Sequence, residues 1–250
     1  MNVCVTTSLR LTDDLRQQAK TIAKDLNIPY LERQKLSLTK LFLDWETVLV
    51  LSKERLSLEQ SSGQSLFFHP DTAMLRIKAS HDPLLNLIGN ESITILDCTM
   101  GLASDSLVMA SAGHEVTALE SNHLIHYLVT YGLQHTQTAL PKLNRAMREL
   151  VTLHSDSLTY LQAQPSKSVD IIYFDPMFSE KIAESANLSG LLGLANSSPL
   201  SKELFEQACR VARRKIILKA HFRDQTFEEL GLTRVIRPNQ KFHYGYLDLY

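Results

Sequence analysis

The chain has 250 residues, 44% of them hydrophobic, with nine Gly and eight Pro. This composition excludes a disordered or collagen-like polymer and allows one sizeable α/β domain with a small appendage. No apolar run is long enough to cross a bilayer, and residues 1–10 lack the apolar core of a signal peptide, so we expect a cytoplasmic protein without membrane attachment.

The formal net charge of −1 gives no support to nucleic-acid binding through overall basicity. Charge is nevertheless unevenly distributed, because residues 202–241 hold ten Lys or Arg against five Asp or Glu, whereas residues 81–201 hold five against twelve. A basic carboxyl-terminal face can meet a polyanion, and the competing interpretation is a merely solvated surface.

The first 80 residues predict a small α/β domain. Apolar residues recur at helical spacing after Thr12, which is a suitable N-cap. The expected elements, in order, are a strand over 2–7, a helix over 11–26, a short helix over 37–43, two strands over 47–51 and 55–58, and a linking region over 64–80.

Residues 81–250 predict a second, larger domain, because strands and helices alternate from residue 92 onward. Such alternation is typical of parallel βαβ units. The expected strands cover 93–97, 115–119, 150–154, 169–174 and 215–219, and a final hairpin covers 232–236 and 243–249 at one edge of the sheet. The expected helices cover 104–112, 122–136, 157–164 and 201–212.

The stretch from Ile93 to Asp105 organises this second domain. A buried strand ends in Asp97, a tight turn follows at Gly101, and a helix then begins. In open α/β sheets ligands bind at the carboxyl edge of the strands, and a glycine lets the backbone approach them. A carboxylate suits an ammonium group better than a phosphate, so we expect an amino acid or its nucleoside derivative. A nicotinamide fingerprint needs a second glycine where Ala103 stands.

Acidic residues close four successive predicted strands: Asp97, Glu120, Asp156 and Asp175. Parallel strands bring these ends to one rim, where Asp97 is placed to receive an ammonium and Glu120 to accept from ribose hydroxyls. Asp156 is placed to accept from an adenine amino group. The amino end of the following helix, at Ser104 and Asp105, completes the floor. Taken singly, each strand-end acid is as well explained as a helix cap or turn former.

The turn from Asp175 through Pro176 to Phe178 is the catalytic candidate. A rigid proline turn can aim the Asp175 carboxylate and the Pro176 carbonyl at an exocyclic amine, while the Phe178 ring stacks on the base that carries it. An aromatic amine is a poor nucleophile, so the main contribution of such a turn is position. The alternative is a strand-ending turn with a core phenylalanine.

Two of these segments resemble known motifs. Asp97-Cys-Thr-Met-Gly101-Leu-Ala-Ser-Asp105 resembles motif I of class I S-adenosylmethionine-dependent methyltransferases, and Asp175-Pro-Met-Phe178 resembles motif IV of their amino-methylating members. Together they most closely resemble the family of the ribosomal RNA small-subunit methyltransferase J. Four further segments are similar to the Gram-positive branch of that family: Val5-Thr-Thr-Ser8, Arg33-x-Lys35-Leu-Ser37-Leu, Phe68-His-Pro70 and Leu75-Arg-Ile-Lys78.

The resemblance implies a Rossmann-like seven-stranded sheet, S-adenosylmethionine as methyl donor, and methylation of guanine N2 in small-subunit ribosomal RNA. It places cofactor contacts at Ser104, Asp105, Glu120, Ser121 and Asp175. The implied partner is ribosomal RNA or the small ribosomal subunit.

Other interpretations remain open. Ser179 replaces the Pro that follows this motif in the ribosomal enzymes, and the Lys-rich segment that usually follows is absent, so the target base stays open. Because overall basicity is weak, the acceptor is alternatively DNA adenine, a protein or a small molecule. A non-catalytic cofactor-binding factor for ribosome assembly is the non-enzymatic alternative. For an RNA substrate, the basic residues expected to contact phosphates are Arg76, Lys78, Arg213, Arg214 and Lys215.

No metal site is expected. The three cysteines, Cys4, Cys98 and Cys209, are too few and too scattered for a disulfide framework or a Cys-rich site. His123 and His126 lie three residues apart on a predicted helix, without a Cys or carboxylate at ligand spacing.

Overall fold

A computed structural model describes residues 2–10, 12–176 and 200–249. Contacts within the chain group these residues into two compact units. The first unit contains the described residues up to His69 together with 123–136, and the second contains the remainder. Within the described ranges, no helix is long and apolar enough to span a membrane.

The first unit is built on a four-stranded sheet with the order β1-β2-β3-β4. Strands β1 and β2 are parallel, and the other neighbouring pairs are antiparallel. Its strands are β1 (Val3–Thr7), β2 (Thr47–Leu51), β3 (Leu56–Gln60) and β4 (Ser65–Phe67), and its helices are α1 (Asp13–Asp25), α2 (Leu38–Leu41) and α6 (His123–His135).

Helix α1 forms as the sequence predicts. The Thr12 hydroxyl accepts a hydrogen bond from the Leu15 backbone N–H at 3.2 Å, which caps the helix. The residues at helical spacing along one side, Leu15, Ala19 and Ile22, are buried, and the helix contacts β1. Amphipathic spacing and a cap therefore fix this helix.

Helix α6 contacts β3 and β4 and closely approaches the residue after β4. A Cβ atom built on Gly132 would lie 2.3 Å from Cβ of the buried Phe68. Only glycine fits at this position, so Gly132 permits the contact between α6 and the chain that follows the sheet.

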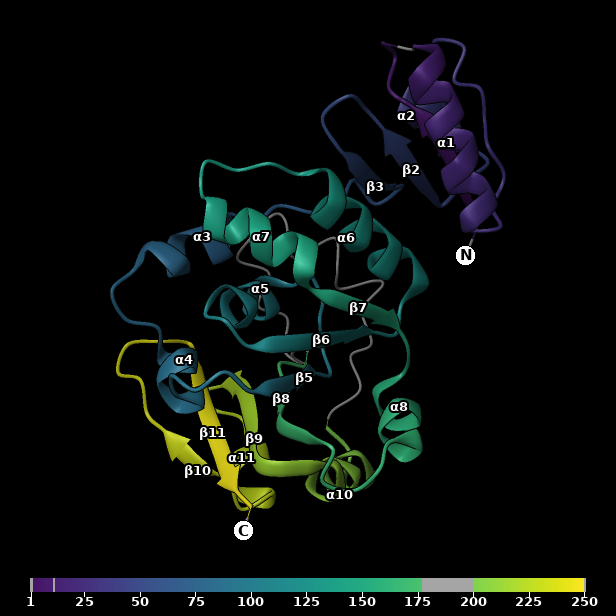
Figure 1. The fold of residues 1–250 in the computed structure, drawn as a ribbon. Coiled ribbons are helices and arrows are strands. Elements are labelled where there is room, and N and C mark those ends of the chain that lie inside the picture. Colours follow the sequence, from purple (N-terminus) through teal and green to yellow (C-terminus); the bar gives the residue numbers. More distant parts are fainter. Residues whose placement is uncertain (1, 11, 177–199, 250) are drawn as a thin grey trace. The chain divides into compact units, whose positions relative to one another are not determined.

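The second unit contains a seven-stranded sheet with the order β10-β11-β9-β8-β5-β6-β7 (Figure 1). Five neighbouring strands, β9, β8, β5, β6 and β7, are parallel to one another. Strand β11 pairs antiparallel with β9 and with β10, so the β10–β11 hairpin forms one edge of the sheet. The strands are β5 (Thr94–Asp97), β6 (Glu115–Glu120), β7 (Val151–His154), β8 (Val169–Phe174), β9 (Ala212–His221), β10 (Thr233–Val235) and β11 (Phe242–Asp248). Strand order reverses between β5 and β8, and such a switch point is where open sheets bind ligands.

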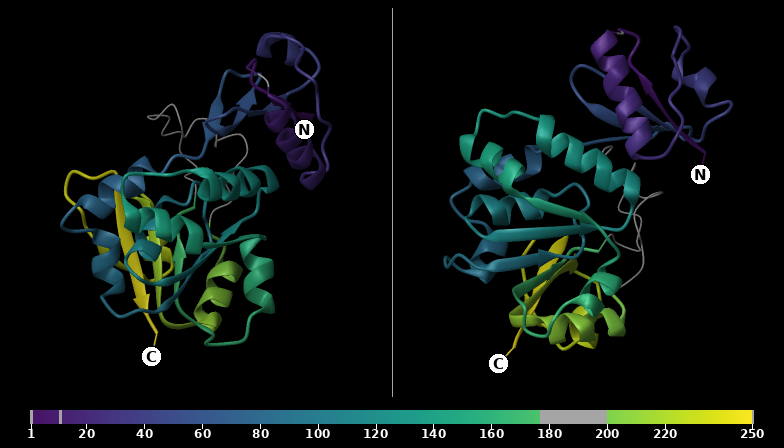
Figure 2. Two further views of the ribbon diagram at one scale, coloured as in Figure 1. Left: turned by 45° about the horizontal axis from the view of Figure 1, so that its top comes forward. Right: turned by 45° about the vertical axis from the view of Figure 1, so that its right-hand side comes forward.

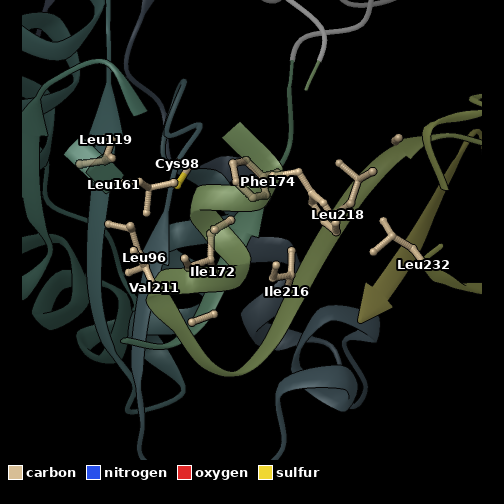
Figure 3. Close-up of a cluster of buried hydrophobic side chains, with 14 of the residues drawn as sticks. Leu96, Cys98, Leu119, Leu161, Ile172, Phe174, Val211, Ile216, Leu218 and Leu232 are labelled. Carbon is tan, nitrogen blue, oxygen red and sulfur yellow. The ribbon is translucent and has the colours of Figure 1, made fainter. Parts of the chain in front are cut away.

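Helices cover both faces of this sheet (Figure 2). Helices α3, α5 and α7 contact one another on one face, and α8 and α10 contact one another on the other. The helices of this unit are α3 (Asp71–Lys78), α4 (Pro83–Ile88), α5 (Ser104–Ser111), α7 (Pro141–Glu149), α8 (Ser157–Ala163), α10 (Lys202–Val211) and α11 (Thr226–Glu229). A cluster of buried side chains, including Leu96, Ile172, Phe174, Val211 and Leu218, fills the space beneath α8 and α10 (Figure 3).

The predicted strands and helices of both units are confirmed to within a few residues, including the carboxyl-terminal hairpin at the sheet edge. The expectation of a linking region over 64–80 is wrong, because β4 and α3 form there. Helices α4, α7 and α11 are absent from the expected elements. Contacts place α3 with the second unit, whereas the domain division into 1–80 and 81–250 stays a prediction.

Candidate active site

The carboxyl ends of β5 and β8 bring Asp97 and Asp175 together at the switch point of the sheet. The Thr99 hydroxyl joins the two turns, because it accepts from the Asp175 backbone N–H at 2.6 Å and donates to Asp97 Oδ1 at 3.4 Å. The turn that follows β5 and the turn that follows β8 are therefore held against each other by one side chain.

Asp97 is almost fully buried and already accepts two short hydrogen bonds. The Thr99 backbone N–H donates to Oδ1 at 2.9 Å, and the Ser106 hydroxyl donates to Oδ2. Burial, with the neighbouring Asp105 and Asp175 charges, raises the pKa of Asp97 to about 7. Oδ1 accepts from both the N–H and the hydroxyl of Thr99, so Oδ2 retains the acceptor capacity that suits an ammonium group or its bound water.

The turn at Gly101 is open toward the edge of the sheet. Gly101 has φ +49°, and Ala103, which precedes α5, has φ +61°. The nearest heavy atom to a Cβ built on Gly101 would be the Thr99 carbonyl oxygen at 4.0 Å. No side chain fills this space, so a ligand can approach the backbone here.

Glu120 closes β6 beside this turn and is buried. Its Oε2 accepts from the Gly101 backbone N–H at 3.2 Å, and its Oε1 accepts from the Asn122 N–H at 2.8 Å. Burial raises the pKa of Glu120 above its ordinary value. The Ser121 carbonyl oxygen lies 3.0 Å from Nε2 of His154 at the end of β7. Glu120 thus anchors the glycine turn and retains lone pairs for a diol.

Asp156 differs from the other strand-end acids because it is exposed. Its Oδ1 accepts from the Thr159 backbone N–H at 3.0 Å and from the Thr159 hydroxyl at 3.1 Å, which caps α8. The helix-cap interpretation therefore accounts for this oxygen. Ser104, the first residue of α5, is half-buried.

Asp105 lies at the centre of a buried ionic cluster. Its carboxylate accepts from the Arg76 guanidinium, from the Tyr173 hydroxyl at 2.9 Å and from Nζ of Lys219 at 2.9 Å. Burial alone would raise the pKa of Asp105, but the charges of Lys219 and Arg76 outweigh burial and hold it below its usual range. Three donors converge on this carboxylate, which makes it a structural centre of the site.

Lys219 is the residue that the sequence analysis missed. Its Nζ lies 2.6 Å from Oδ2 of Asp175 as well as close to Asp105. Burial opposes its charge, but the two carboxylates outweigh burial and raise the pKa of Lys219. Burial and the Asp105 carboxylate raise the pKa of Asp175 above its ordinary value, and Lys219 opposes them. Lys219 lies near the carboxyl end of β9, so extending the strand-end rule to basic residues would have found it.

Most of the basic residues expected to contact phosphates are engaged elsewhere. Arg213 and Arg214 pair with Asp170 at 3.4 Å and 3.2 Å, and Lys215 follows them at the amino end of β9. Because β9 is parallel to β8, this end lies at the opposite edge of the sheet from the turn after β8. Arg76 is held by buried carboxylates. The expected phosphate contacts of these four residues stay a prediction, which their ion pairs and, for the three on β9, their position do not favour.

The rest of the catalytic candidate is only partly described. Pro176 is half-buried, and Phe178 lies outside the described residues. Within the described ranges, no group of three or more His, Cys, Asp or Glu side chains is arranged to hold a metal ion.

Comparison with known proteins decides the family. A family model described as a putative SAM-dependent methyltransferase matches residues 31–237 of this chain. The chain belongs to the SAM-dependent methyltransferases. The seven-stranded sheet accordingly identifies a class I, Rossmann-like methyltransferase, whose cofactor is S-adenosylmethionine.

Two relatives of this methyltransferase match most of its length. The uncharacterized protein YpiP of Bacillus subtilis is 38% identical over 96% of this chain and 97% of its own length. The ribosomal RNA small subunit methyltransferase J of Thioalkalivibrio sulfidiphilus is 30% identical over 83% of this chain and 84% of its own. The chain is thus a methyltransferase related to the methyltransferase J family, as its motifs indicate.

A solved structure shares the fold over nearly the whole chain. The SAM-dependent methyltransferase NGO1261 of Neisseria gonorrhoeae matches with a TM-score of 0.64 over 99% of this chain and 96% of that protein, at 17% identity. The observed site fits the cofactor, because an open glycine turn lies between two buried carboxylates, Asp97 and Glu120, that retain acceptor capacity.

Proposed function

We propose that this methyltransferase acts in the cytoplasm on ribosomal RNA and methylates an exocyclic amine, N2 of a guanine in the small-subunit RNA. The observation that carries the proposal is the adjacency of the Asp175 turn and the Asp97 turn, which share the Thr99 hydroxyl. A methyl-accepting amine held at the Asp175 turn would lie next to a methyl donor held at the Asp97 turn. The relatives named ribosomal RNA small subunit methyltransferase J support the choice of acceptor.

The cofactor is proposed to rest on the carboxyl edge of β5, β6 and β7. Asp97 holds the ammonium of its amino acid part above the Gly101 turn, and Glu120 accepts from the ribose hydroxyls. Asp156 accepts from the adenine amino group through the carboxylate that also caps α8. The complete proposed set of cofactor-binding residues is Asp97, Gly101, Ser104, Asp105, Glu120, Ser121, Asp156 and Asp175.

The bound cofactor supplies an electrophilic methyl group on a sulfonium centre. Asp175 and the Pro176 carbonyl accept hydrogen bonds from the target amine, which orients its lone pair toward the methyl carbon. When bound, the cofactor would give its methyl group to the nitrogen so oriented and would leave as an uncharged thioether. Lys219 holds Oδ2 of Asp175, so we assign Oδ1 to the amine and to the proton that the methylated nitrogen releases. Phe178 is proposed to stack on the base.

Transfer of labelled methyl groups tests this function. The protein is incubated with labelled S-adenosylmethionine and with RNA, small ribosomal subunits or total protein from cells that lack its gene, and the products are digested to nucleosides. We expect label in small-subunit RNA as N2-methylguanosine. Label in DNA, protein or a small molecule would replace the acceptor and leave the enzyme class unchanged. Cofactor binding without any transfer would favour the non-catalytic assembly factor.

A further inference from the structure

We propose that a rim of aromatic and basic side chains, at the end of β9 and the start of β11, binds the single-stranded RNA that flanks the target nucleotide. The aromatic–basic rim, as we name it, consists of His221, Phe222, Arg223, Arg237, Lys241 and Phe242. This inference rests on the proposed function, because it takes RNA as the substrate.

The rim lies at the same edge of the sheet as the catalytic turn. Strand β9 runs parallel to β8, and its last residue, His221, lies beyond the pairing of Leu218 with Phe174. Strand β11 is antiparallel to β9, so its first residue, Phe242, pairs with His221 at this edge. The hairpin therefore returns the chain to the carboxyl edge, where Asp175 lies.

Aromatic rings form a continuous run from the ionic cluster to the surface. Nζ of Lys219, which pairs with Asp175, lies 5.8 Å from the Phe242 ring centre. The Phe242 and His221 ring centres are 6.5 Å apart, and those of His221 and Phe222 are 4.5 Å apart. Successive bases of a single strand stack on such rings whatever their sequence, since every base has a π-face.

The outer end of this run is accessible. Phe222 is 37% exposed and Ile236, in the adjoining loop, is 70% exposed, so both present apolar surface to solvent. The guanidinium carbon of the exposed Arg223 lies 5.0 Å from the Phe222 ring centre. Because this guanidinium lies over the ring, a base would stack on the guanidinium plane that covers Phe222, with the same cation close to the adjoining phosphate.

Further positive charge follows the same edge. The Phe222 backbone N–H donates to the Lys241 carbonyl at 2.9 Å, which places the exposed Lys241 opposite Phe222 in the chain that leads into β11. Arg237 lies in the same loop, and its guanidinium carbon is 5.5 Å from the Tyr244 ring centre. A surface that alternates rings with cations matches RNA, which alternates bases with phosphates.

Acidic side chains beside α11 mark a part of the surface that the RNA strand would avoid. A cavity of about 500 Å³ beside α11 is lined by Phe222, by two basic residues, Arg223 and Arg234, and by three acidic residues, Asp224, Glu228 and Glu229. Glu228 pairs with Arg234 at 3.5 Å, and the remaining excess of carboxylates would oppose a phosphate chain. The geometry therefore directs the RNA along the loop over 236–241, away from α11.

Binding of a fluorescein-labelled oligouridylate and of transcribed small-subunit RNA, measured by fluorescence anisotropy at several salt concentrations, tests the rim. Phe222→Ala should weaken binding of both RNAs roughly tenfold without changing the salt dependence, and Phe222→Tyr should restore it. Arg223→Glu combined with Lys241→Glu should weaken binding by more than tenfold and reduce the salt slope by about two, one for each lost cation.

A matched control carries the same change of charge away from the rim. Arg145→Glu with Lys167→Glu alters an exposed residue of α7 and an exposed residue before β8, at the opposite edge of the sheet. RNA affinity should fall far less in this control, and all variants should retain the wild-type melting temperature and bind S-adenosylhomocysteine within about twofold.

The outcomes separate the rim from the proposed function. Rim variants that bind RNA as the wild type does, or a control that loses as much affinity, would overturn the rim. A wild-type protein that transfers no methyl group to RNA would overturn the proposed function, while the anisotropy measurements would still decide whether the rim binds RNA.

Discussion

Nζ of Lys219 lies 2.6 Å from Oδ2 of Asp175, and the same ammonium lies 2.9 Å from Oδ2 of Asp105. One buried cation thus serves two carboxylates, one at the proposed catalytic turn and one at the start of α5. Removing one charged side chain from a buried cluster lowers the stability of the fold, because the remaining charges stay buried without their partner. Lys219 therefore controls both the position and the ionisation of Asp175.

Lys219→Met should move the pH dependence of methyl transfer. Burial and Asp105 already raise the pKa of Asp175, and the Lys219 charge opposes that rise. Without the ammonium the pKa of Asp175 rises further. The acid limb of the profile of kcat against pH should therefore shift upward by roughly one pH unit or more. Lys219→Arg keeps the charge and should leave the limb close to its wild-type position. Profiles of kcat against pH at saturating cofactor measure the shift, and coincident profiles for the two variants would contradict this role.

Asp175→Ala should abolish methyl transfer while S-adenosylhomocysteine binds within a few fold of wild type. The amine loses the acceptor that orients it. The cofactor loses one of its proposed contacts and keeps the two principal ones, at Asp97 and Glu120. Single-turnover transfer and calorimetric titration of S-adenosylhomocysteine measure the two effects separately. Transfer at the wild-type rate would refute the assigned role of Asp175.

Glu120→Ala should weaken cofactor binding with little effect on kcat at saturating cofactor. The substitution removes the proposed acceptor of the ribose hydroxyls and the acceptor of the Gly101 N–H. Hydrogen bonds to a charged group contribute about 1.5–3 kcal/mol, so we expect affinity to fall roughly ten- to a hundredfold. Calorimetry with S-adenosylhomocysteine measures the loss. Glu115→Ala, at the exposed start of β6, is the control and should leave affinity unchanged.

Asp105→Asn should lower the free energy of unfolding at pH 7 by about 3–5 kcal/mol, because Arg76 and Lys219 lose a shared buried counter-charge. The pKa of Asp105 is held below its unfolded value of about 3.9, so its contribution is fully present above that pH and is lost as pH falls further. The difference between variant and wild type in urea unfolding should therefore shrink below about pH 4. A difference independent of pH would show that packing, not charge, is lost.

Gly132→Ala should destabilise the first unit by about 1–3 kcal/mol, since the added methyl group overlaps the Phe68 side chain. The only tryptophan, Trp45, packs against the small core of that unit and reports its unfolding by fluorescence. The urea midpoint of this signal should fall in the variant. Gln134→Ala, on the exposed side of the same helix, should leave the midpoint unchanged.

Strand ends were predictable because apolar runs are easy to delimit and parallel connection brings their carboxyl ends to one edge. Asp97, Glu120 and Asp175 were found in this way, and the glycine turn with them. The ionic partners were not predictable, since Lys219 lies 44 residues from Asp175 and 114 from Asp105. No local spacing rule connects residues so far apart in the chain.

The sequence did not predict α7 and β4, for two different reasons. Helix α7 carries detectable signals, a proline at its first position and buried Leu143, Ala146 and Met147 at helical spacing, and these were overlooked. Strand β4 has only three residues and forms because β3 offers it an antiparallel partner. Its existence depends on tertiary pairing, which composition over 64–80 does not reveal.

The antiparallel return of β11 has an evolutionary consequence. Most residues proposed to hold the methyl donor follow strands β5 to β7, and the turn proposed to orient the acceptor amine follows β8. The aromatic–basic rim comes from the end of β9 and the chain around the β10–β11 hairpin. Donor binding and the proposed binding of flanking RNA are thus encoded in separate, consecutive stretches of the chain. Exchange of the residues after Lys219 between relatives would replace the aromatic–basic rim and keep the ion pair of Lys219 with Asp175, so chimeras joined there would change RNA preference without changing the catalytic turn.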